Sequence, residues 1–450
     1  MGEQEHTAEG GAPRGFRGGG GNGKGHGGNG KGQASRKRRS SYNALALVEH
    51  VERRANWVGE IRFNQLAERI EVRNPPWPIA PAWYGNGDAL VSADGWRPLT
   101  DADLREAMLH LQANGVGWVK VGNVLELLAI LGDRALHHPV RVYLRRLIWD
   151  GTARVHRLFT HYIPAQLPTD PKRRARLVEY LEAIGPRFLV GAVARAEQPG
   201  CKVDNMISLV GPQGRHKSTS IEALCPTTDL FAEETSCDLD NRDVKLSLSS
   251  KWFIEFSEGA VLGAEIRRLK GFLTRKVDTL RLPYGRLIIN KPRQSIFVLT
   301  TNLLRLKDTT GNRRYWPIQI ADNAINIDAI IADRDELWGE AATLFADGYQ
   351  WWLTPELEAL AAEQQARYAD APDPTTDLVR DWVAGKDGFP LTDVLQKALG
   401  LSKPEILRGG GKINREVTDA LHELGYESYL NNERGRDRGK RLWGLAERPV

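Results

Sequence analysis

The stretch Asn205-Met-Ile-Ser-Leu-Val-Gly211-Pro-Gln-Gly-Arg-His-Lys217-Ser-Thr219 decides the fold. It begins as a short apolar run typical of a buried strand and then turns through two glycines. It continues into Ile221-Glu-Ala-Leu224, which favours a helix. Glycines allow successive backbone N–H groups to point at one anion, and the following helix N-terminus favours negative charge. The stretch therefore predicts a phosphate-binding P-loop between a strand and a helix.

Each residue of this loop is a candidate nucleotide ligand: Gly211, Pro212, Gln213, Gly214, Arg215, His216, Lys217, Ser218 and Thr219. In a P-loop the lysine reaches the β- and γ-phosphates of ATP, and the next hydroxyl binds Mg²⁺, so Lys217 and Ser218 are assigned these roles. The position before the lysine, which is glycine in the usual pattern, holds His216. Its side chain would narrow the phosphate channel or require an unusual backbone angle, unless Gly214 supplies the flexibility.

Acidic residues follow a second apolar run, Trp252-Phe-Ile-Glu255-Phe-Ser-Glu258. A strand beside a P-loop needs a carboxylate for the metal, and a second acid can activate the attacking water. We assign Glu255 to the metal and Glu258 to the water, although the two roles could be exchanged. A third apolar run, residues 295–301, ends at Asn302. In ring ATPases such an Asn lies beside the γ-phosphate and helps to position the water; the alternative is an Asn in an ordinary turn, which is common.

Two groups of basic residues stand out. Arg313 and Arg314 follow a glycine turn, and either could act as an arginine finger or form an ordinary surface ion pair. Residues 267–293 hold nine Lys or Arg against a single Asp. This stretch is predicted to bind a nucleic-acid backbone or to be a solvated basic face. The nucleic-acid ligands proposed within it are Arg275, Lys276, Arg281, Tyr284 and Arg286.

The composition narrows the class of protein. The net charge of +5 lies entirely in residues 1–40, which carry eight Lys or Arg and three Glu, so the rest of the chain is neutral. No apolar run approaches the roughly 18 residues that span a bilayer, and no export signal is recognisable. Three cysteines are too few for a disulfide framework or a zinc site. We expect a cytoplasmic protein without a membrane partner and without zinc.

The remaining segments suggest further domains. Residues 1–40 are glycine-rich and predicted to be disordered. Residues 41–200 are predicted to form a mostly helical domain. Within it, Gly185-Pro186 is expected to interrupt a helix. Asp101 and Asp103 are expected to cap a helix rather than to bind a metal. Residues 201–369 would form the core and 370–376 a linker. Residues 377–450, with helices near 377–382, 392–399 and 412–424 and a strand pair, resemble a winged-helix-like DNA-binding module.

Together these motifs resemble the virulence-associated E family, mobile-element ATPases related to superfamily 3 helicases. The resemblance runs from about residue 138 to 320 and includes Pro139-Val-Arg-Val-Tyr143 and Trp149-Asp-Gly151. It implies an α/β, AAA+-like P-loop ATPase core that assembles as a ring, expected to be a hexamer. It places Asn302 at the sensor position, a DNA-gripping hairpin within 274–294, and Arg313 or Arg314 at a neighbouring subunit's ATP. It also implies a bacterial, phage or plasmid origin. The absence of a primase carboxylate set predicts no priming activity.

These observations predict a DNA helicase or replication motor that hydrolyses ATP with Mg²⁺ and acts on single-stranded or origin DNA. One alternative is a replication initiator or regulator in which ATP is a switch and little unwinding occurs. Another is a P-loop enzyme of a different class, such as a small-molecule kinase, which would be a monomer and would have no use for the basic stretch.

Overall fold

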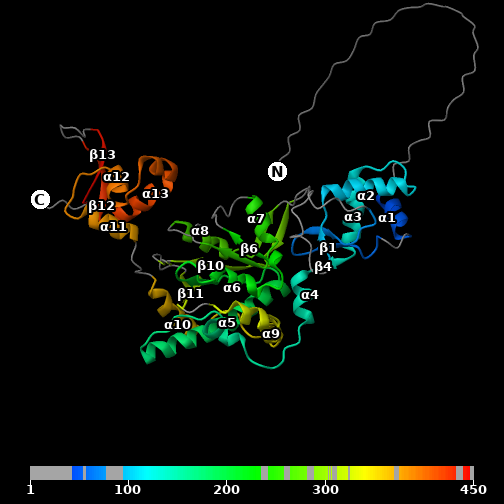
Figure 1. Ribbon diagram of the computed structural model, residues 1–450, viewed down its shortest axis with the longest axis horizontal. Coiled ribbons are helices and arrows are strands. Elements are labelled where there is room, and N and C mark those ends of the chain that lie inside the picture. The colour runs from blue at the N-terminus through cyan, green and yellow to red at the C-terminus, as the bar shows by residue number, and fades with distance from the viewer. Residues whose placement is uncertain are drawn as a thin grey trace, which may run out of the picture.

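A five-stranded, fully parallel sheet lies at the centre of the computed structural model (Figure 1). The structure describes residues 43–53, 57–77, 95–234, 242–257, 264–280, 288–302, 304, 306, 312–322, 325–368, 374–431 and 439–445. Within them, the sheet has the order β11-β5-β10-β7-β6, with β5 (Met206–Val210), β6 (Phe231–Glu234), β7 (Phe253–Phe256), β10 (Ile296–Thr301) and β11 (Tyr315–Gln319). The α/β class predicted for this region is confirmed. The edge strand β6 was not predicted, because its sequence, Phe-Ala-Glu-Glu, has no apolar run.

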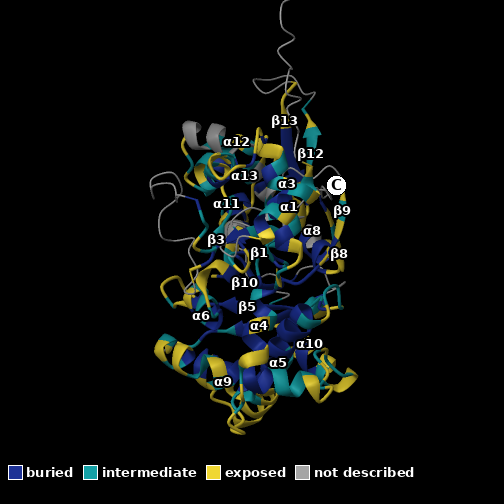
Figure 2. Cartoon of the chain, turned by 90° about the vertical axis from the view of Figure 1, so that its right-hand side faces the viewer, coloured by how far each residue is buried: buried dark blue, intermediate teal, exposed yellow. Residues whose placement is uncertain are grey.

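Helices cover both faces of the sheet, as its apolar strands predict. One face packs against α5 (Pro171–Glu197), α6 (Lys217–Leu224) and α9 (Ile327–Ala346), and the other packs against α8 (Ala264–Leu273). Successive residues of β5 alternate between the two cores: Ile207 belongs to the first and Met206 to the second. Figure 2 shows the buried residues concentrated between α5 and the sheet. The sheet is therefore covered on both faces.

The helix interruption predicted at Gly185-Pro186 is wrong, because α5 continues through Pro186 to Glu197. Both residues are buried, and a Cβ on Gly185 would lie 2.6 Å from the Val155 carbonyl oxygen. Packing on this scale overrides the local cost of a proline in a helix. The same core also crosses the predicted domain boundary at residue 200, since it joins Val140 and α5 to the sheet.

The segment before the core has its own hydrophobic cluster. It contains α1 (Ala44–Glu52), α2 (Asp101–Ala113), α3 (Val121–Asp133) and a sheet of order β3-β2-β1-β4, formed by Arg97–Pro98, Arg69–Val72, Ile61–Asn64 and Leu136–His137. Asp103 closes a capping box with Thr100 at the start of α2 and accepts hydrogen bonds from Arg97 and Trp77. The predicted capping role of Asp103 is confirmed by this geometry.

The turn between β1 and β2 joins this N-terminal domain to the core. Leu66, at the turn, is fully buried within the hydrophobic cluster of the central sheet. Its carbonyl accepts a 2.6 Å hydrogen bond from Lys291 Nζ, and Glu68 Oε1 lies 3.7 Å from the same ammonium. Burial lowers the pKa of Lys291 to about 8. The turn is therefore both an apolar and a polar anchor.

A second connection lies at His138, which caps α4 (Pro139–Arg146). Its Nδ1 accepts from the Arg141 backbone N–H at 3.2 Å, and its Nε2 lies 2.5 Å from Gln294 Oε1. The neutral tautomer with its proton on Nε2 satisfies both contacts. Burial lowers the pKa of His138 to about 4.

The elements of the C-terminal module (Figure 1) have a separate hydrophobic cluster. It consists of α11 (Pro374–Val383), α12 (Leu391–Asp393), the π-helix η8 (Val394–Ala398), α13 (Lys403–Glu423) and the antiparallel pair β12 (Tyr426–Leu430) and β13 (Arg441–Leu445). The structure extends two expectations. Residues 374–376 of the predicted linker already belong to α11, and α13 begins nine residues before the predicted start at Lys412.

We predict that His138 makes stability fall in mild acid. Above pH 6.5 the side chain is neutral in both states; between pH 6.5 and 4 only the unfolded chain binds a proton, so folding loses on the order of 3 kcal/mol. His138→Asn retains a capping side chain without the titration. Urea unfolding of both proteins across this range should show the wild type losing more stability. Parallel pH profiles would contradict the assignment.

Candidate functional site

The predicted P-loop connects the carboxyl end of β5 to α6, which begins at Lys217. Gly214 has φ +81°, and His216 is left-handed, with φ +56° and ψ +29°. The unusual backbone angle expected at His216 is therefore present. Gly214 also has a positive φ, so it does not replace the strained conformation of His216. The His216 side chain is exposed and caps no helix N–H. The cost of this conformation for a residue with a Cβ is about 1–2 kcal/mol.

The Lys217 side chain turns back into the loop. Its buried ammonium donates to the carbonyl oxygens of Gly211 at 2.6 Å and Pro212 at 2.9 Å. Asn302, at the carboxyl end of β10, has its Oδ1 3.5 Å from the same nitrogen. The structure thus brings together the lysine and the amide predicted to meet at one phosphate. The Thr219 side chain is exposed.

Glu255 is the most constrained group of the site. It is fully buried on β7, and its Oε1 accepts from the Ser218 hydroxyl at 2.6 Å and from the Thr300 hydroxyl. Its Oε2 is also buried and has no hydrogen-bond partner among the described residues. Burial raises the pKa of this carboxyl, while the two hydroxyls and the charge of Lys217 oppose the rise. A buried acceptor without a donor leaves a place for a cation or its water.

Sequence reasoning missed Thr300. The available signal was a pair of polar residues, Thr300 and Thr301, at the end of an otherwise apolar strand. Because β10 lies between β5 and β7, its side chains reach both the loop and Glu255. The site therefore joins the carboxyl ends of three adjacent parallel strands, which is where open α/β sheets bind ligands.

Arg215 attaches the loop to the segment after β11. Its guanidinium donates to the Asp322 carboxylate at 2.9 Å and also to the Asp322 backbone carbonyl. Nearby, Ala321 N–H donates to Pro164 O at 2.9 Å, so the chain around residue 164 borders the same edge. Among the nine predicted loop ligands, the Arg215 and Ser218 side chains both contact carboxylates of the described structure, those of Asp322 and Glu255.

Helix α9 fixes the far end of α6. Trp338 Nε1 donates to the Leu224 carbonyl at 2.7 Å, and Arg334 donates to the Cys225 carbonyl at 3.1 Å. These donors satisfy carbonyls that a helix end leaves unpaired. The position of the P-loop helix is thus set by contacts at its C-terminal end as well as by the loop.

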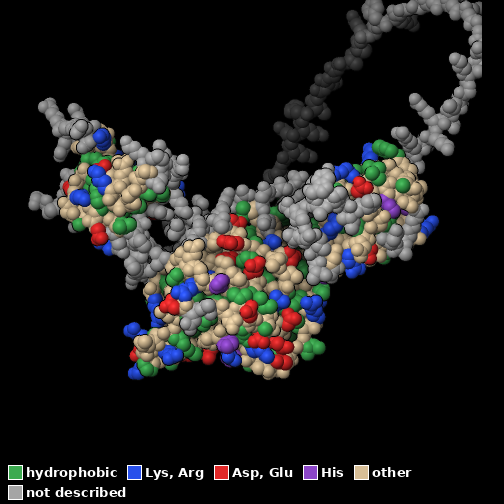
Figure 3. All heavy atoms as spheres, in the orientation of Figure 1, with side chains coloured by type: hydrophobic (Ala, Val, Ile, Leu, Met, Phe, Trp, Pro, Cys, Tyr) green, Lys and Arg blue, Asp and Glu red, His purple; other side chains and the backbone are tan. Residues whose placement is uncertain are grey.

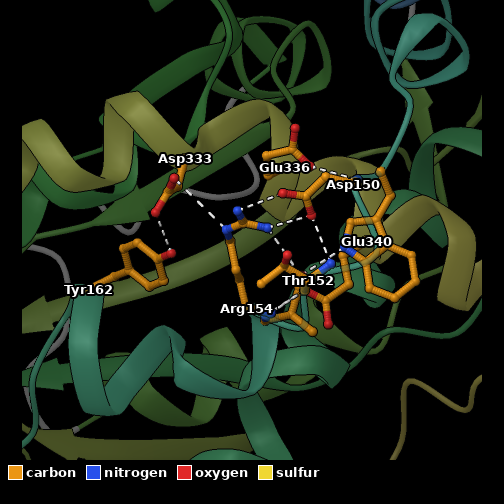
Figure 4. Close-up of polar contacts among 9 residues, drawn as sticks. Asp150, Thr152, Arg154, Tyr162, Asp333, Glu336 and Glu340 are labelled. Carbon is orange, nitrogen blue, oxygen red and sulfur yellow. Dashed lines mark hydrogen bonds and ion pairs between the residues drawn. The ribbon is translucent and has the colours of Figure 1, made fainter.

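Helix α9 also contacts the Trp149-Asp-Gly151 motif: the Asp150 backbone N–H donates to the Glu336 carboxylate at 3.0 Å (Figure 4). Arg154 pairs with Asp150 at 2.8 Å and lies 3.9 Å from Asp333, while Glu340 accepts from the Arg154 and Val155 backbone N–H groups. A Cβ on Gly339 would lie 3.3 Å from Trp149 backbone atoms. This motif is therefore explained by its contacts with α9, and Arg154 forms ion pairs with Asp150 and Asp333.

Arg313 and Arg314 lie away from the P-loop of their own chain. They belong to the short helix η7 (Asn312–Arg314), directly before β11, whose first residue pairs with Met206 at the start of β5. The P-loop follows the other end of β5. Arg314 has its Nε 4.0 Å from Asp204, whereas the Arg313 side chain is exposed. The two arginines therefore lie at the amino ends of the parallel strands, and the loop lies at their carboxyl ends.

A β-hairpin occupies the middle of the basic stretch. Strands β8 (Val277–Leu280) and β9 (Ile289–Pro292) pair antiparallel, as the expected position of a hairpin within 274–294 requires. Arg275 and Lys276 are exposed at its base. Glu258, Arg281, Tyr284 and Arg286 lie outside the described residues.

Three members of the basic stretch do not form a solvated or nucleic-acid-binding face. Arg293 is buried, pairs with Asp278 at 2.6 Å and lies 3.9 Å over the Phe272 ring. Lys270 donates to Asn312, and Lys291 donates to Leu66. The charge count of the sequence overstates the exposed positive charge here, because these three cations stabilise the interior.

The surface and the helices add two observations. On the face drawn in Figure 3, basic and acidic side chains are interspersed over the central body. Among the described residues, no helix is long and apolar enough to cross a bilayer, and no cluster of three His, Cys, Asp or Glu side chains could hold a metal.

Comparison with protein families identifies the region that contains the site. A model described as a virulence-associated protein E-like domain matches residues 144–370, which is half of the chain. This chain belongs to the virulence-associated protein E-like family. The family predicted from the sequence is thereby confirmed. The matched region includes the loop, Glu255, Asn302 and the hairpin, but not the N-terminal domain or the C-terminal module.

Other comparisons are more distant. The chain is similar to the apo C-terminal region of NrS-1 in its A form, with 10% identity, a TM-score of 0.39, and coverage of 90% of this chain and 100% of that one. An apo structure of NrS-1 residues 305–718 gives 11% identity, a TM-score of 0.37, and coverage of 90% and 99%. Comparison with curated proteins found no match.

We predict that His216→Gly stabilises the virulence-associated protein E-like domain. Glycine adopts the left-handed conformation without the Cβ clash, so the free energy of unfolding should rise by about 0.5–1 kcal/mol after allowing for the greater entropy of the unfolded chain. His216→Ala is the matched control, since it removes the imidazole but keeps the Cβ. Urea denaturation should rank glycine above both alanine and histidine. Equal stability of the glycine and alanine variants would show that the angle stores no strain.

Proposed function

We propose that this chain is a Mg²⁺-dependent ATPase that moves on DNA as a ring, expected to be a hexamer. The observation that supports it most directly is the 2.6 Å hydrogen bond from the Ser218 hydroxyl to Glu255. Ser218 directly follows Lys217, whose ammonium lies inside the loop. Hydroxyl and carboxylate oxygens are the ligands Mg²⁺ prefers, and Mg²⁺ in such sites takes few protein ligands together with water and phosphate oxygens. Glu255 Oε2, to which no described residue donates a hydrogen bond, fits that requirement.

Each residue of the site has a distinct role in this proposal. The loop N–H groups and Lys217 bind the phosphates and neutralise their charge. Ser218 and Glu255 hold Mg²⁺, which supplies electrostatic stabilisation of the transferring phosphoryl group. Thr300 orients Glu255 by occupying Oε1, and Asn302 orients the attacking water. Glu258 remains our candidate for accepting the proton of that water.

The position of the arginines supports an oligomer. With five residues of β5 between the two edges of the sheet, η7 is about 13 Å or more from the P-loop of the same chain. An arginine at that edge can reach a phosphate only in a neighbouring subunit. Arg313 is the better candidate for the arginine finger, because its side chain is exposed while that of Arg314 lies 4.0 Å from Asp204.

The hairpin is our proposed DNA-binding element. It lies between Glu255 and Asn302 in the sequence, so a grip on DNA would be built into the nucleotide-binding sheet itself. Arg275 and Lys276 provide exposed cations at its base, and Arg281, Tyr284 and Arg286 belong to the segment between its strands. Replication of a phage, plasmid or genomic island in a bacterial cytoplasm is the setting that the family implies.

A second candidate function rests on the C-terminal module. Its helices α11, η8 and α13 and its two-stranded sheet form a compact unit with a separate core, as a winged-helix-like DNA-binding module would. The chain would then be an ATP-switched initiator or regulator that recognises DNA and unwinds little. Single-stranded DNA should stimulate ATP turnover by a motor but leave that of a switch unchanged.

We predict that Lys217→Ala reduces ATP turnover about 100-fold or more, since it removes a preorganised cation from the phosphates. Glu255→Gln should still bind the nucleotide, but Mg²⁺ should no longer strengthen that binding. Lys172→Ala, on the exposed start of α5, is the matched control and should hydrolyse ATP normally. Phosphate release at saturating Mg-ATP measures the turnover of each variant, and nucleotide binding titrated with and without Mg²⁺ tests Glu255→Gln. Wild-type turnover by Lys217→Ala would refute the proposed activity.

We further predict that replacing Arg275 and Lys276 together by glutamine weakens binding to single-stranded DNA. If both contact phosphates, the slope of log K against log salt should become less negative by about 1.4. Lys172→Gln with Arg173→Gln removes the same charge from exposed positions on α5. Fluorescence anisotropy at several salt concentrations compares the pairs. An unchanged slope at the hairpin pair would place the DNA site elsewhere.

A further inference from the structure

Asn312 links the arginine helix to a second element. It is the first residue of η7, next to Arg313, and it is 9% exposed. Its Oδ1 accepts from Lys270 Nζ at 3.1 Å, and its Nδ2 donates to the Leu306 carbonyl at 3.0 Å. Both ends of the amide are therefore used, which fixes the orientation of the side chain.

Lys270 stands in the last turn of α8, close to the hairpin. It is 7% exposed, and α8 ends three residues later at Leu273. Phe272 O accepts from the Arg275 N–H at 3.2 Å and from the Arg293 guanidinium at 2.5 Å. Since Arg293 follows β9 and pairs with Asp278 on β8, the end of α8 is tied to both strands of the hairpin.

Buried polar contacts resist separation more than exposed ones. Moving Lys270 away from Asn312 without a replacement would break a buried hydrogen bond of both side chains, at a cost in free energy. Apolar packing reinforces the contact, because Leu269, Leu306 and Tyr315 share one hydrophobic cluster. The arginine helix and the end of α8 should therefore move as one body.

We propose that the Asn312–Lys270 contact couples the arginine helix to the hairpin, so that the nucleotide bound by a neighbouring subunit sets the position of the DNA-binding element. This inference rests on the proposed function of Arg313 and the hairpin. Asn312 and Lys270 are positioning residues, since neither reaches the P-loop of its own chain. The coupling predicts that DNA stimulates hydrolysis through this contact.

The experiment is a double-mutant cycle with Lys270→Met and Asn312→Ala. We expect either change to lower the stimulation of ATP turnover by single-stranded DNA about fivefold or more, with the double variant no worse than the singles. Basal turnover and DNA affinity should remain within about twofold of wild type, because neither residue contacts the nucleotide or the DNA in this proposal. Lys172→Met is the matched control. Undiminished stimulation in both single variants, or additive losses in the double variant, would overturn the coupling.

Hydrogen exchange separates this inference from the proposed function. Asn312→Ala should accelerate exchange of the amides at the end of α8 and in β8 and β9, a result that requires no ATP turnover. Unchanged exchange there would refute the link even in an active enzyme. A wild-type protein that hydrolyses no ATP would refute the proposed function, while faster exchange in Asn312→Ala would still support the mechanical connection.

Discussion

The buried carboxylate of Glu255 sets the geometry on which the rest of the site depends. One of its oxygens is held by hydroxyls from two different elements, Ser218 at the start of α6 and Thr300 on β10. Such an arrangement requires β7, β10 and the P-loop helix to keep fixed positions relative to one another, because a buried charge is tolerated only when its partners are in place. Burial also raises the pKa of this carboxyl, so the energetic cost of keeping it ionised favours a nearby cation.

The sequence predicted the elements whose local pattern agrees with their final environment. The strands at β5, β7, β10 and β11 are apolar on both faces, and the glycine-containing loop follows β5 directly. Lys217, Glu255 and Asn302 could be assigned to one site because each lies within or just after one of these apolar runs in the pattern of a P-loop ATPase. Where long-range packing decides, the local pattern misled: α5 passes through Pro186 because its neighbours hold it. Thr300 was missed because its partner is remote in sequence.

The basic stretch shows why charge alone does not define a surface. Lys270, Lys291 and Arg293 look no different in the sequence from Arg275 and Lys276, yet the first three are buried. Their partners are an amide, a backbone carbonyl and a ring with a carboxylate, which lie 42, 225 and 15–21 residues away. Spacing along the chain cannot reveal such partners, so the sequence identified the region of the hairpin but not which cations remain available for a ligand.

The turn at Leu66 has a consequence for the evolution and dissection of the chain. A residue from the N-terminal domain completes the apolar interior of the central sheet, and its carbonyl receives the ammonium of Lys291. Deleting the domain would therefore open to water the apolar surface that Leu66 covers and the ammonium of Lys291. A shortened relative that lacks this domain should carry polar side chains on that surface, whereas a lysine at the position of Lys291 would be hydrated there.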